Sequence, residues 1–174
     1  MTNGALSGIR VLDLSRVLAG PSCGQLFADL GAEVIKIEDR AGDENRNWLP
    51  VVDGRGANYM SVNRGKRGMT LNLKSPSGQR ILESLILRAD VLIENFPPAT
   101  AERLGLSWER TSSINPDLIH VSITGYGSRG PLRDRPDAAK RGAFPRHSRG
   151  VRAGFDCVME CGKPVIAAVN GAAI

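Results

Sequence analysis

The stretch from Ile9 to Glu38 restricts the possible folds of this chain more than any other. It opens with an apolar run that has little polar alternation, followed by Ala19-Gly20-Pro21. Such a run is typical of a strand that is covered on both faces, as in a parallel sheet. Proline is favoured at the first position of a helix, and apolar residues then recur at helical spacing as far as Gly31. The sequence EVIKIE at 33–38 predicts a second strand, so the stretch is a βαβ unit.

Strand and helix patterns continue to alternate along the chain as far as residue 136. Apolar runs predict strands at 69–73, 90–95 and 118–123. Ser75-Pro76 and Ser107 mark the starts of two helices, and a third helix is expected from about residue 100. The segment 39–58 is polar and predicts a long surface loop in which Trp48 is the anchor. We expect an α/β fold with an incomplete doubly wound, mostly parallel, Rossmann-like sheet over 6–136, and a helix-strand appendage at 137–174.

In an open parallel sheet, ligands bind at the carboxyl ends of the strands. The predicted helix after the first strand would offer free backbone N–H groups at Ser22, Cys23 and Gly24, which suit an anion. The glycines at 20 and 24 match neither the dinucleotide-binding fingerprint nor the phosphate loop. These residues alone therefore predict an α/β domain and leave a nucleotide-like ligand open.

Composition excludes several classes of function. The net charge of +5 comes from the stretch 138–155, which holds five basic residues and no acid; elsewhere 18 basic residues balance 18 acids. No aromatic residues alternate with these cations, so we expect no nucleic-acid partner. No run approaches the about 20 apolar residues of a membrane span, and the N-terminus does not resemble a signal peptide. Three sparse cysteines predict a cytoplasmic protein, and the weak spacing of Cys157, Cys161 and His147 predicts thiols without a metal.

Four segments together carry a family resemblance. The βαβ stretch is followed by NRGKRGMTLNLKSPSG at 63–78, ADVLIENFPPATAERLGL at 89–106 and INPDLIHVSITGYGSRGPLRDRP at 114–136. In order and spacing they resemble family III CoA-transferases, the family of formyl-CoA transferase, carnitine CoA-transferase and α-methylacyl-CoA racemase. The resemblance implies transfer of CoA between an acyl-CoA and a carboxylic acid, with acyl-CoA as the small-molecule partner. It also implies a homodimer, which we expect only of a complete chain.

The resemblance places the CoA-binding residues after the first, third and fourth predicted strands: Leu18, Ala19, Leu71, Lys74, Asn95, Phe96 and Arg103. The first two would contact the adenosine part, and Lys74 and Arg103 would bind phosphates through charge-assisted hydrogen bonds. Each cation could instead be a solvated surface residue. Where the family often has a cation, directly after the second strand, this chain has Asp39.

The basic turn at 64–67 leaves two interpretations open. Arg64, Lys66 and Arg67 either belong to a solvated turn or face a phosphate-bearing ligand. The residues themselves do not decide between the two.

The catalytic group that the resemblance implies is an aspartate whose carboxylate attacks the thioester. No residue of this chain matches its position, so we expect a chain truncated before it and assign no catalytic residue. Residues 154–174 resemble instead the segment of enoyl-CoA hydratases, the crotonase family, that precedes a glycine-rich oxyanion turn. An enoyl-CoA hydratase or isomerase remnant and a non-catalytic CoA-binding or inert fusion fragment are therefore the alternatives, and activity stays open.

Overall fold

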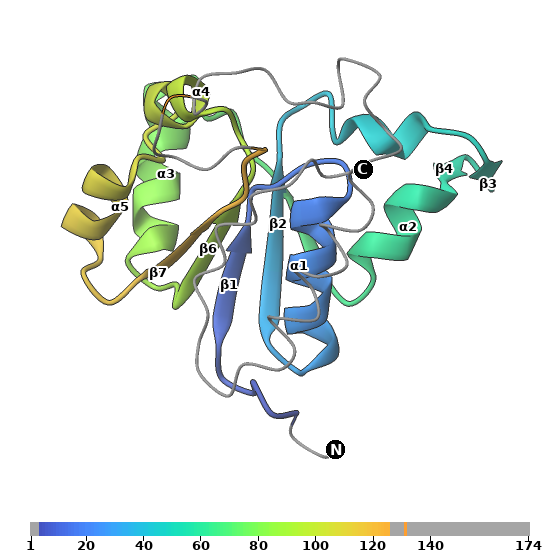
Figure 1. Ribbon diagram of the computed structural model, residues 1–174, viewed down its shortest axis with the longest axis horizontal. Coiled ribbons are helices and arrows are strands. Elements are labelled where there is room, and N and C mark those ends of the chain that lie inside the picture. Colours follow the sequence, from blue (N-terminus) through green and yellow to red (C-terminus); the bar gives the residue numbers. More distant parts are fainter. Residues whose placement is uncertain (1–3, 126–130, 132–174) are drawn as a thin grey trace.

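The computed structural model describes residues 4–125 and residue 131. Its centre is a five-stranded sheet in the order β5-β2-β1-β6-β7, and every neighbouring pair is parallel (Figure 1). The strands are β1 (Arg10–Asp13), β2 (Glu33–Glu38), β5 (Arg67–Thr70), β6 (Val91–Glu94) and β7 (Ile119–Ser122). The predicted α/β class and the mostly parallel sheet are confirmed. The predicted appendage at 137–174, including its crotonase-like part, lies outside the described residues.

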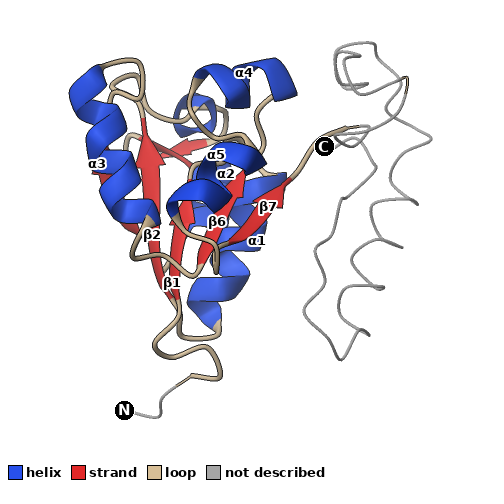
Figure 2. Ribbon diagram, turned by 90° about the vertical axis from the view of Figure 1, so that its left-hand side faces the viewer, coloured by secondary structure: helices blue, strands red, loops and turns tan. Residues whose placement is uncertain are grey.

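Apolar side chains cover both faces of this sheet because successive strand residues point to opposite sides. Val11 packs with Val34 and Val91 on one face, whereas Leu12 packs with Leu92 on the other. Helix α1 (Ala19–Asp29) covers the first face. Helices α3 (Pro76–Ile86), α4 (Pro98–Arg103) and α5 (Trp108–Ile114) contribute side chains to the second face, as Figure 2 shows for α1 and α3 on opposite sides. Continuous apolar strands are thus required by two-sided burial.

The helix signals in the sequence were mostly correct. Ser75 caps α3 by accepting a hydrogen bond from the Gly78 N–H at 3.1 Å, and Ser107 caps α5 in the same way. Gly31, just after α1, has a φ of 96°, which a residue with a Cβ rarely adopts. The predicted start of α1 was wrong, because the helix begins at Ala19 and Pro21 is its third residue.

The segment predicted as one long loop holds regular structure. A 3₁₀ helix, η1 (Glu44–Asn47), precedes an antiparallel hairpin of β3 (Val51–Val52) and β4 (Arg55–Gly56), which leads into helix α2 (Ala57–Asn63). Buried polar groups anchor the segment: Asn45 has no exposed surface, whereas the expected anchor Trp48 is 41% exposed. Among residues 4–125, no helix has the length and apolar character needed to cross a bilayer.

Candidate functional site

The connections that follow β1 and β6 leave the sheet in opposite directions. β1 continues into α1 on one face, and its neighbour β6 continues into α4 and α5 on the other. Such a divergence opens a crevice outside the carboxyl ends of the two strands, where open α/β sheets bind ligands. Figure 1 shows these carboxyl ends at the top of the sheet, close to α4 and the first turn of α3.

Two predicted binding residues lie at the start of α1. Leu18 is the residue before the helix and Ala19 its first residue, and both are partly buried. The carbonyl of Leu18 accepts hydrogen bonds from the N–H and the hydroxyl of Ser22, at 2.8 and 2.7 Å. The prediction of a free N–H at Ser22 is therefore wrong, because the helix begins two residues earlier than expected.

Asn95, at the end of β6, faces the loop that follows β1. Its side-chain oxygen accepts a hydrogen bond from the Arg16 N–H at 2.8 Å, and its side-chain nitrogen donates to the Arg16 carbonyl at 2.9 Å. One amide side chain thus joins both sides of the crevice. The structure brings Asn95 to the loop that leads into Leu18 and Ala19, and its amide oxygen and nitrogen each bond the protein itself.

Phe96 is buried, and its ring lies 5.5 Å from the guanidinium carbon of Arg16, a cation–π arrangement. The same guanidinium forms an ion pair with Asp39 at 2.7 Å. Partial burial tends to raise the pKa of Asp39, but the hydrogen bond and charge of Arg16 lower it below its usual value. The acid that stands where the family often has a cation is therefore neutralised by a cation from the neighbouring loop.

Leu71 belongs to the core rather than to the rim of the crevice. Only 6% of its surface is exposed, and its N–H continues the sheet by donating to the Glu38 carbonyl at 2.8 Å. Its side chain packs in the cluster that α3 covers. Leu71 can therefore affect the site only through the packing of the core below it.

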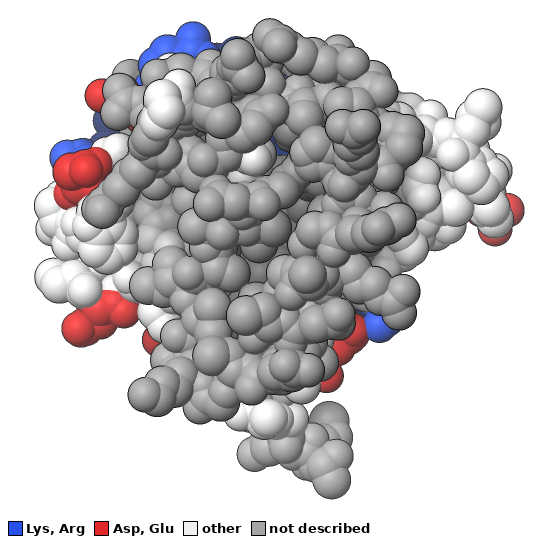
Figure 3. Space-filling view, viewed as in Figure 1, with Lys and Arg blue, Asp and Glu red and all other residues white. Residues whose placement is uncertain are grey.

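The two predicted phosphate ligands, Lys74 and Arg103, are both exposed. Gln79 holds their segments together, because its side-chain nitrogen donates to the Leu73 carbonyl at 2.5 Å and to the Leu104 carbonyl at 2.9 Å. Neither cation forms an ion pair with a carboxylate of residues 4–125. In Figure 3, which has the orientation of Figure 1, Lys and Arg atoms are visible at the upper left of this face. Two positive side chains thus lie on one rim of the sheet.

The three cations of the basic turn all pair with carboxylates at 2.7 Å: Arg64 with Asp29, Lys66 with Asp13, and Arg67 with Glu33. The two arginine pairs are largely exposed, which agrees with the solvated interpretation.

Lys66 fits neither interpretation of the turn, because its side chain is 2% exposed and that of Asp13 is 0% exposed. Its ammonium group also donates to the Pro21 carbonyl at 2.7 Å and to Asn63 at 2.9 Å. Burial lowers the pKa of Lys66, and the charge of Asp13 offsets only part of that effect.

The thiol of Cys23 faces the same buried pair. Burial and the charge of Asp13 raise its pKa and the charge of Lys66 lowers it, which leaves the pKa at about 11. A thiol in this state is neutral at physiological pH and is a poor nucleophile. Within the described part of the chain, no three His, Cys, Asp or Glu side chains gather closely enough to hold a metal ion.

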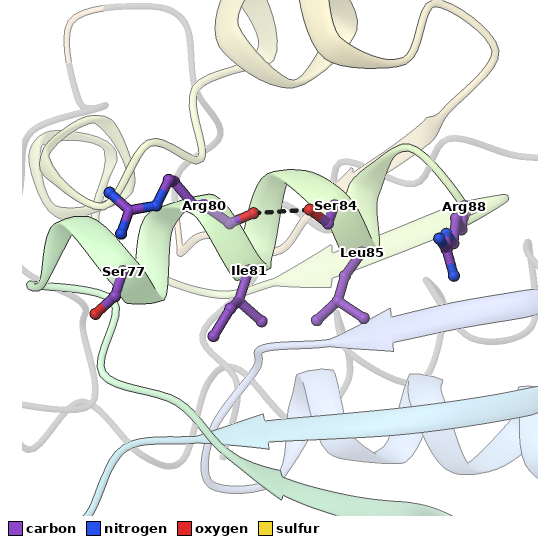
Figure 4. Close-up of a pocket in the computed structure, with 6 residues that line it drawn as sticks. All are labelled: Ser77, Arg80, Ile81, Ser84, Leu85 and Arg88. Atoms are coloured by element: carbon purple, nitrogen blue, oxygen red, sulfur yellow. Dashed lines mark hydrogen bonds between the residues drawn. The ribbon is translucent and has the colours of Figure 1, made fainter.

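A separate groove of about 500 Å³ runs along the outer face of α3. In Figure 4, Ile81 and Leu85 point to the same side of the helix, with Arg80 and Arg88 beside them. None of the predicted binding residues lines this groove.

Sequence reasoning missed four buried polar residues that bind the loop after β1, one of which is Asp13 at the end of that strand. Lys36 lies in β2, and Asp43 and Asn45 lie at the start of η1; each is at most 2% exposed. The lysine within the apolar strand EVIKIE was a usable signal, because an unpaired charge is not tolerated there. The two η1 residues gave none, since Asp and Asn are common in surface loops.

Residues 6–140 match the family model described as CoA-transferase family III. The chain belongs to CoA-transferase family III. Among its relatives, the succinyl-CoA–L-malate CoA-transferase beta subunit of Chloroflexus aurantiacus is 45% identical over 137 residues, which are 78% of this chain and 34% of the relative. The formyl-CoA:oxalate CoA-transferase of Streptomyces coelicolor is 47% identical over 130 residues, 73% of this chain and 31% of the relative.

A solved family structure agrees with the fold. A crystal structure of a CAIB/BAIF family protein from Brucella suis matches with a TM-score of 0.74 and 42% identity, and covers 78% of this chain and 37% of that one. The chain spans about a third of the length of the curated relatives it matches. The family resemblance predicted over 6–136 is confirmed.

Proposed function

We propose that the crevice at the carboxyl ends of β1 and β6 binds CoA or an acyl-CoA. The whole protein would transfer CoA between an acyl-CoA and a carboxylic acid. One observation carries this proposal: the range that matches the family, 6–140, includes both strands and both loops of the crevice. We also propose that the sheet is the first part of a doubly wound, Rossmann-like fold, with 137–174 as a separate appendage.

In this proposal the binding residues have different tasks. Leu18 and Ala19, at the start of α1, pack against the adenosine part of the coenzyme. Lys74 and Arg103, exposed on the rim, bind its phosphates, and charge-assisted hydrogen bonds of this kind are about twice as strong as neutral ones. Asn95, Phe96 and Leu71 shape the crevice from within.

The printed names of the relatives suggest which substrates to test. They act on succinyl-CoA with L-malate and on formyl-CoA with oxalate. We therefore propose a short-chain acyl-CoA as donor and a dicarboxylic acid as acceptor.

The binding proposal is tested by calorimetric titration of the chain with CoA and with dephospho-CoA. Removing a cation that binds a phosphate should weaken CoA binding by roughly tenfold to a hundredfold, because a hydrogen bond to a charged group contributes about 1.5–3 kcal/mol. Lys74→Ala and Arg103→Ala should each show this loss. Arg88→Ala is the matched control. Arg88 is an exposed arginine near the opposite, amino ends of the strands, where its carbonyl accepts a hydrogen bond from the Arg10 side chain. Absence of CoA binding at millimolar concentration would overturn the proposal.

Activity is tested by following acyl exchange from succinyl-CoA or formyl-CoA to malate, glutarate and oxalate by chromatography. Transfer would support the proposed reaction. Hydration of crotonyl-CoA would support the hydratase alternative, and binding without turnover would support a non-catalytic CoA-binding chain.

A further inference from the structure

The loop between β1 and α1 has an unusual hydrogen-bonding pattern. Residues 15–17 carry six backbone polar groups, and each of the six is bonded to a side chain. At Ser15, the N–H donates to Asp13 at 3.0 Å and the carbonyl accepts from the Lys36 ammonium at 2.8 Å. At Arg16, the N–H and the carbonyl bond Asn95 at 2.8 and 2.9 Å.

The third residue of the loop follows the same pattern. The Val17 N–H donates to both carboxylate oxygens of Asp43, at 3.1 and 3.2 Å, and its carbonyl accepts from the side chain of Asn45. Val17 has a φ of 68°, in the left-handed region that β-branched residues disfavour. Such a conformation persists only where the surroundings fix it. The hydrogen bonds from η1 do so here.

The side chains that bind the loop come from four separate parts of the fold. We call them the loop clamp: Asp13 in β1, Lys36 in β2, Asp43 and Asn45 at η1, and Asn95 after β6. Lys36 and Asp43 also form an ion pair at 3.0 Å, with 2% and 0% of their side chains exposed. The clamp is therefore built into the core, and the loop cannot change conformation without leaving buried polar groups unpaired.

We infer that Asn95 and the η1 residues Asp43 and Asn45 are positioning residues for coenzyme binding, an inference that rests on the function proposed above. Each of them bonds the backbone of the loop. By fixing residues 15–17 they set where α1 begins, and so where Leu18 and Ala19 meet the ligand. The backbone of 15–17 is fully bonded, so side chains and the first turn of α1 recognise the coenzyme.

A matched pair of asparagines separates positioning from general stability. Asn115 also bonds backbone with its side chain, donating to the Ile86 and Ala89 carbonyls at 2.9 Å each, but next to the start of β6. Asn95→Ala removes two such bonds and Asn115→Ala removes three, because Asn115 also accepts from the Asp117 N–H at 3.1 Å, so Asn115→Ala should lower stability to urea at least as much. Only Asn95→Ala should weaken CoA binding, by about tenfold.

Amide hydrogen exchange tests the clamp without any coenzyme. In Asn95→Ala the amide of residue 16 should exchange at least about tenfold faster than in the unaltered chain, and in Asn115→Ala it should not. Should Asn95→Ala fail to fold, Asn95→Leu gives the same test, because it keeps a side chain of similar size and removes both the acceptor for the Arg16 N–H and the donor to the Arg16 carbonyl. Unchanged exchange at residue 16 would overturn the clamp itself.

The binding results distinguish this inference from the function on which it rests. If the unaltered chain binds CoA and Asn95→Ala binds it equally well, the positioning role is overturned and the proposed function stands. If the unaltered chain binds no CoA, the proposed function fails and takes the positioning role with it. Faster exchange together with weaker CoA binding, in Asn95→Ala and not in Asn115→Ala, supports the inference.

Discussion

Replacing Lys66 by methionine tests how a buried ion pair holds the end of β1 and the start of α1 together. The change keeps most of the side-chain volume and removes an ammonium that lies 2.7 Å from Asp13. Both side chains are at most 2% exposed, so the carboxylate would be left buried without its cation. Removing one partner of a buried ion pair typically destabilises a protein by about 3–5 kcal/mol.

Arg64→Met is the control, because the structure matches it closely. Arg64 lies in the same turn and pairs with Asp29 at the same distance of 2.7 Å, but the two side chains are 65% and 37% exposed. Exposed pairs contribute about 0–1 kcal/mol. Urea unfolding followed by far-UV circular dichroism should therefore show a midpoint far lower for Lys66→Met than for Arg64→Met, with similar slopes.

A double variant separates the two charges. Burial outweighs the attraction of Asp13 in lowering the pKa of Lys66, so the pair itself contributes little net stability. Asp13→Asn combined with Lys66→Met should then be less destabilised than the sum of the two single variants. Equal losses in Lys66→Met and Arg64→Met, or simple additivity in the double variant, would refute this account of the buried pair.

Three further predictions follow from the same face of the sheet. Gly24→Ala should lower stability to urea by about 1–3 kcal/mol, since its Cβ would meet a carboxylate oxygen at 2.6 Å, whereas Gly68→Ala, with no atom within 4 Å, should change it little. Cys23, whose pKa is about 11, should react with iodoacetamide at pH 8 about a hundredfold more slowly than in urea, in a chain whose other cysteines are serine; equal rates would contradict this. Burial raises the pKa of Glu38, but hydrogen bonds from Arg46 and Tyr59 and the charges of Arg46 and Lys36 together lower it below its usual value. Its contribution to stability is therefore present above the unfolded pKa and lost as pH falls through the folded one. The urea-midpoint gap to Glu38→Gln should shrink in acid, and a constant gap would contradict this.

The sheet could be predicted because its signals are local. An apolar run such as 90–95 predicts a strand covered on both faces, and β6 lies within it with all four residues buried. Ser75 and Ser107 marked helix starts because a hydroxyl before a helix has a defined hydrogen-bond partner. Each of these signals depends on a few neighbouring residues, so tertiary structure had little opportunity to overrule them.

The start of α1 and the structure within 39–58 could not be predicted, because distant residues determine both. α1 begins at Ala19, shortly after residues 15–17, whose backbone the loop clamp bonds. Three of the clamp residues come from β2 and η1. Proline in the first turn of a helix is compatible with a start at either Ala19 or Pro21. Sequence alone therefore could not choose between the two.

The basic turn shows the same limit for the candidate site. Arg64, Lys66 and Arg67 are equivalent in sequence, yet only Lys66 is buried. Space for its ammonium exists because residue 24 of α1 is a glycine. Any other residue there would place a Cβ 3.1 Å from the Lys66 nitrogen. A helix glycine more than forty positions away thus decides which cation enters the core.

The polar residues around the crevice fall into two groups with different consequences for function. Asp13, Lys36, Asp43, Asn45 and Asn95 are bonded to the scaffold, so they fix the geometry of the loop. The cations on the rim are exposed, and the Arg103 guanidinium donates a surface hydrogen bond to the Thr100 hydroxyl at 3.1 Å; both cations can turn toward an anion. In a site of this kind, the buried group sets where a ligand can lie, and the exposed group supplies the charge that attracts it. The family resemblance identifies the exposed cations directly. The buried residues are recognised only when each backbone group of the loop is traced to its hydrogen-bond partner.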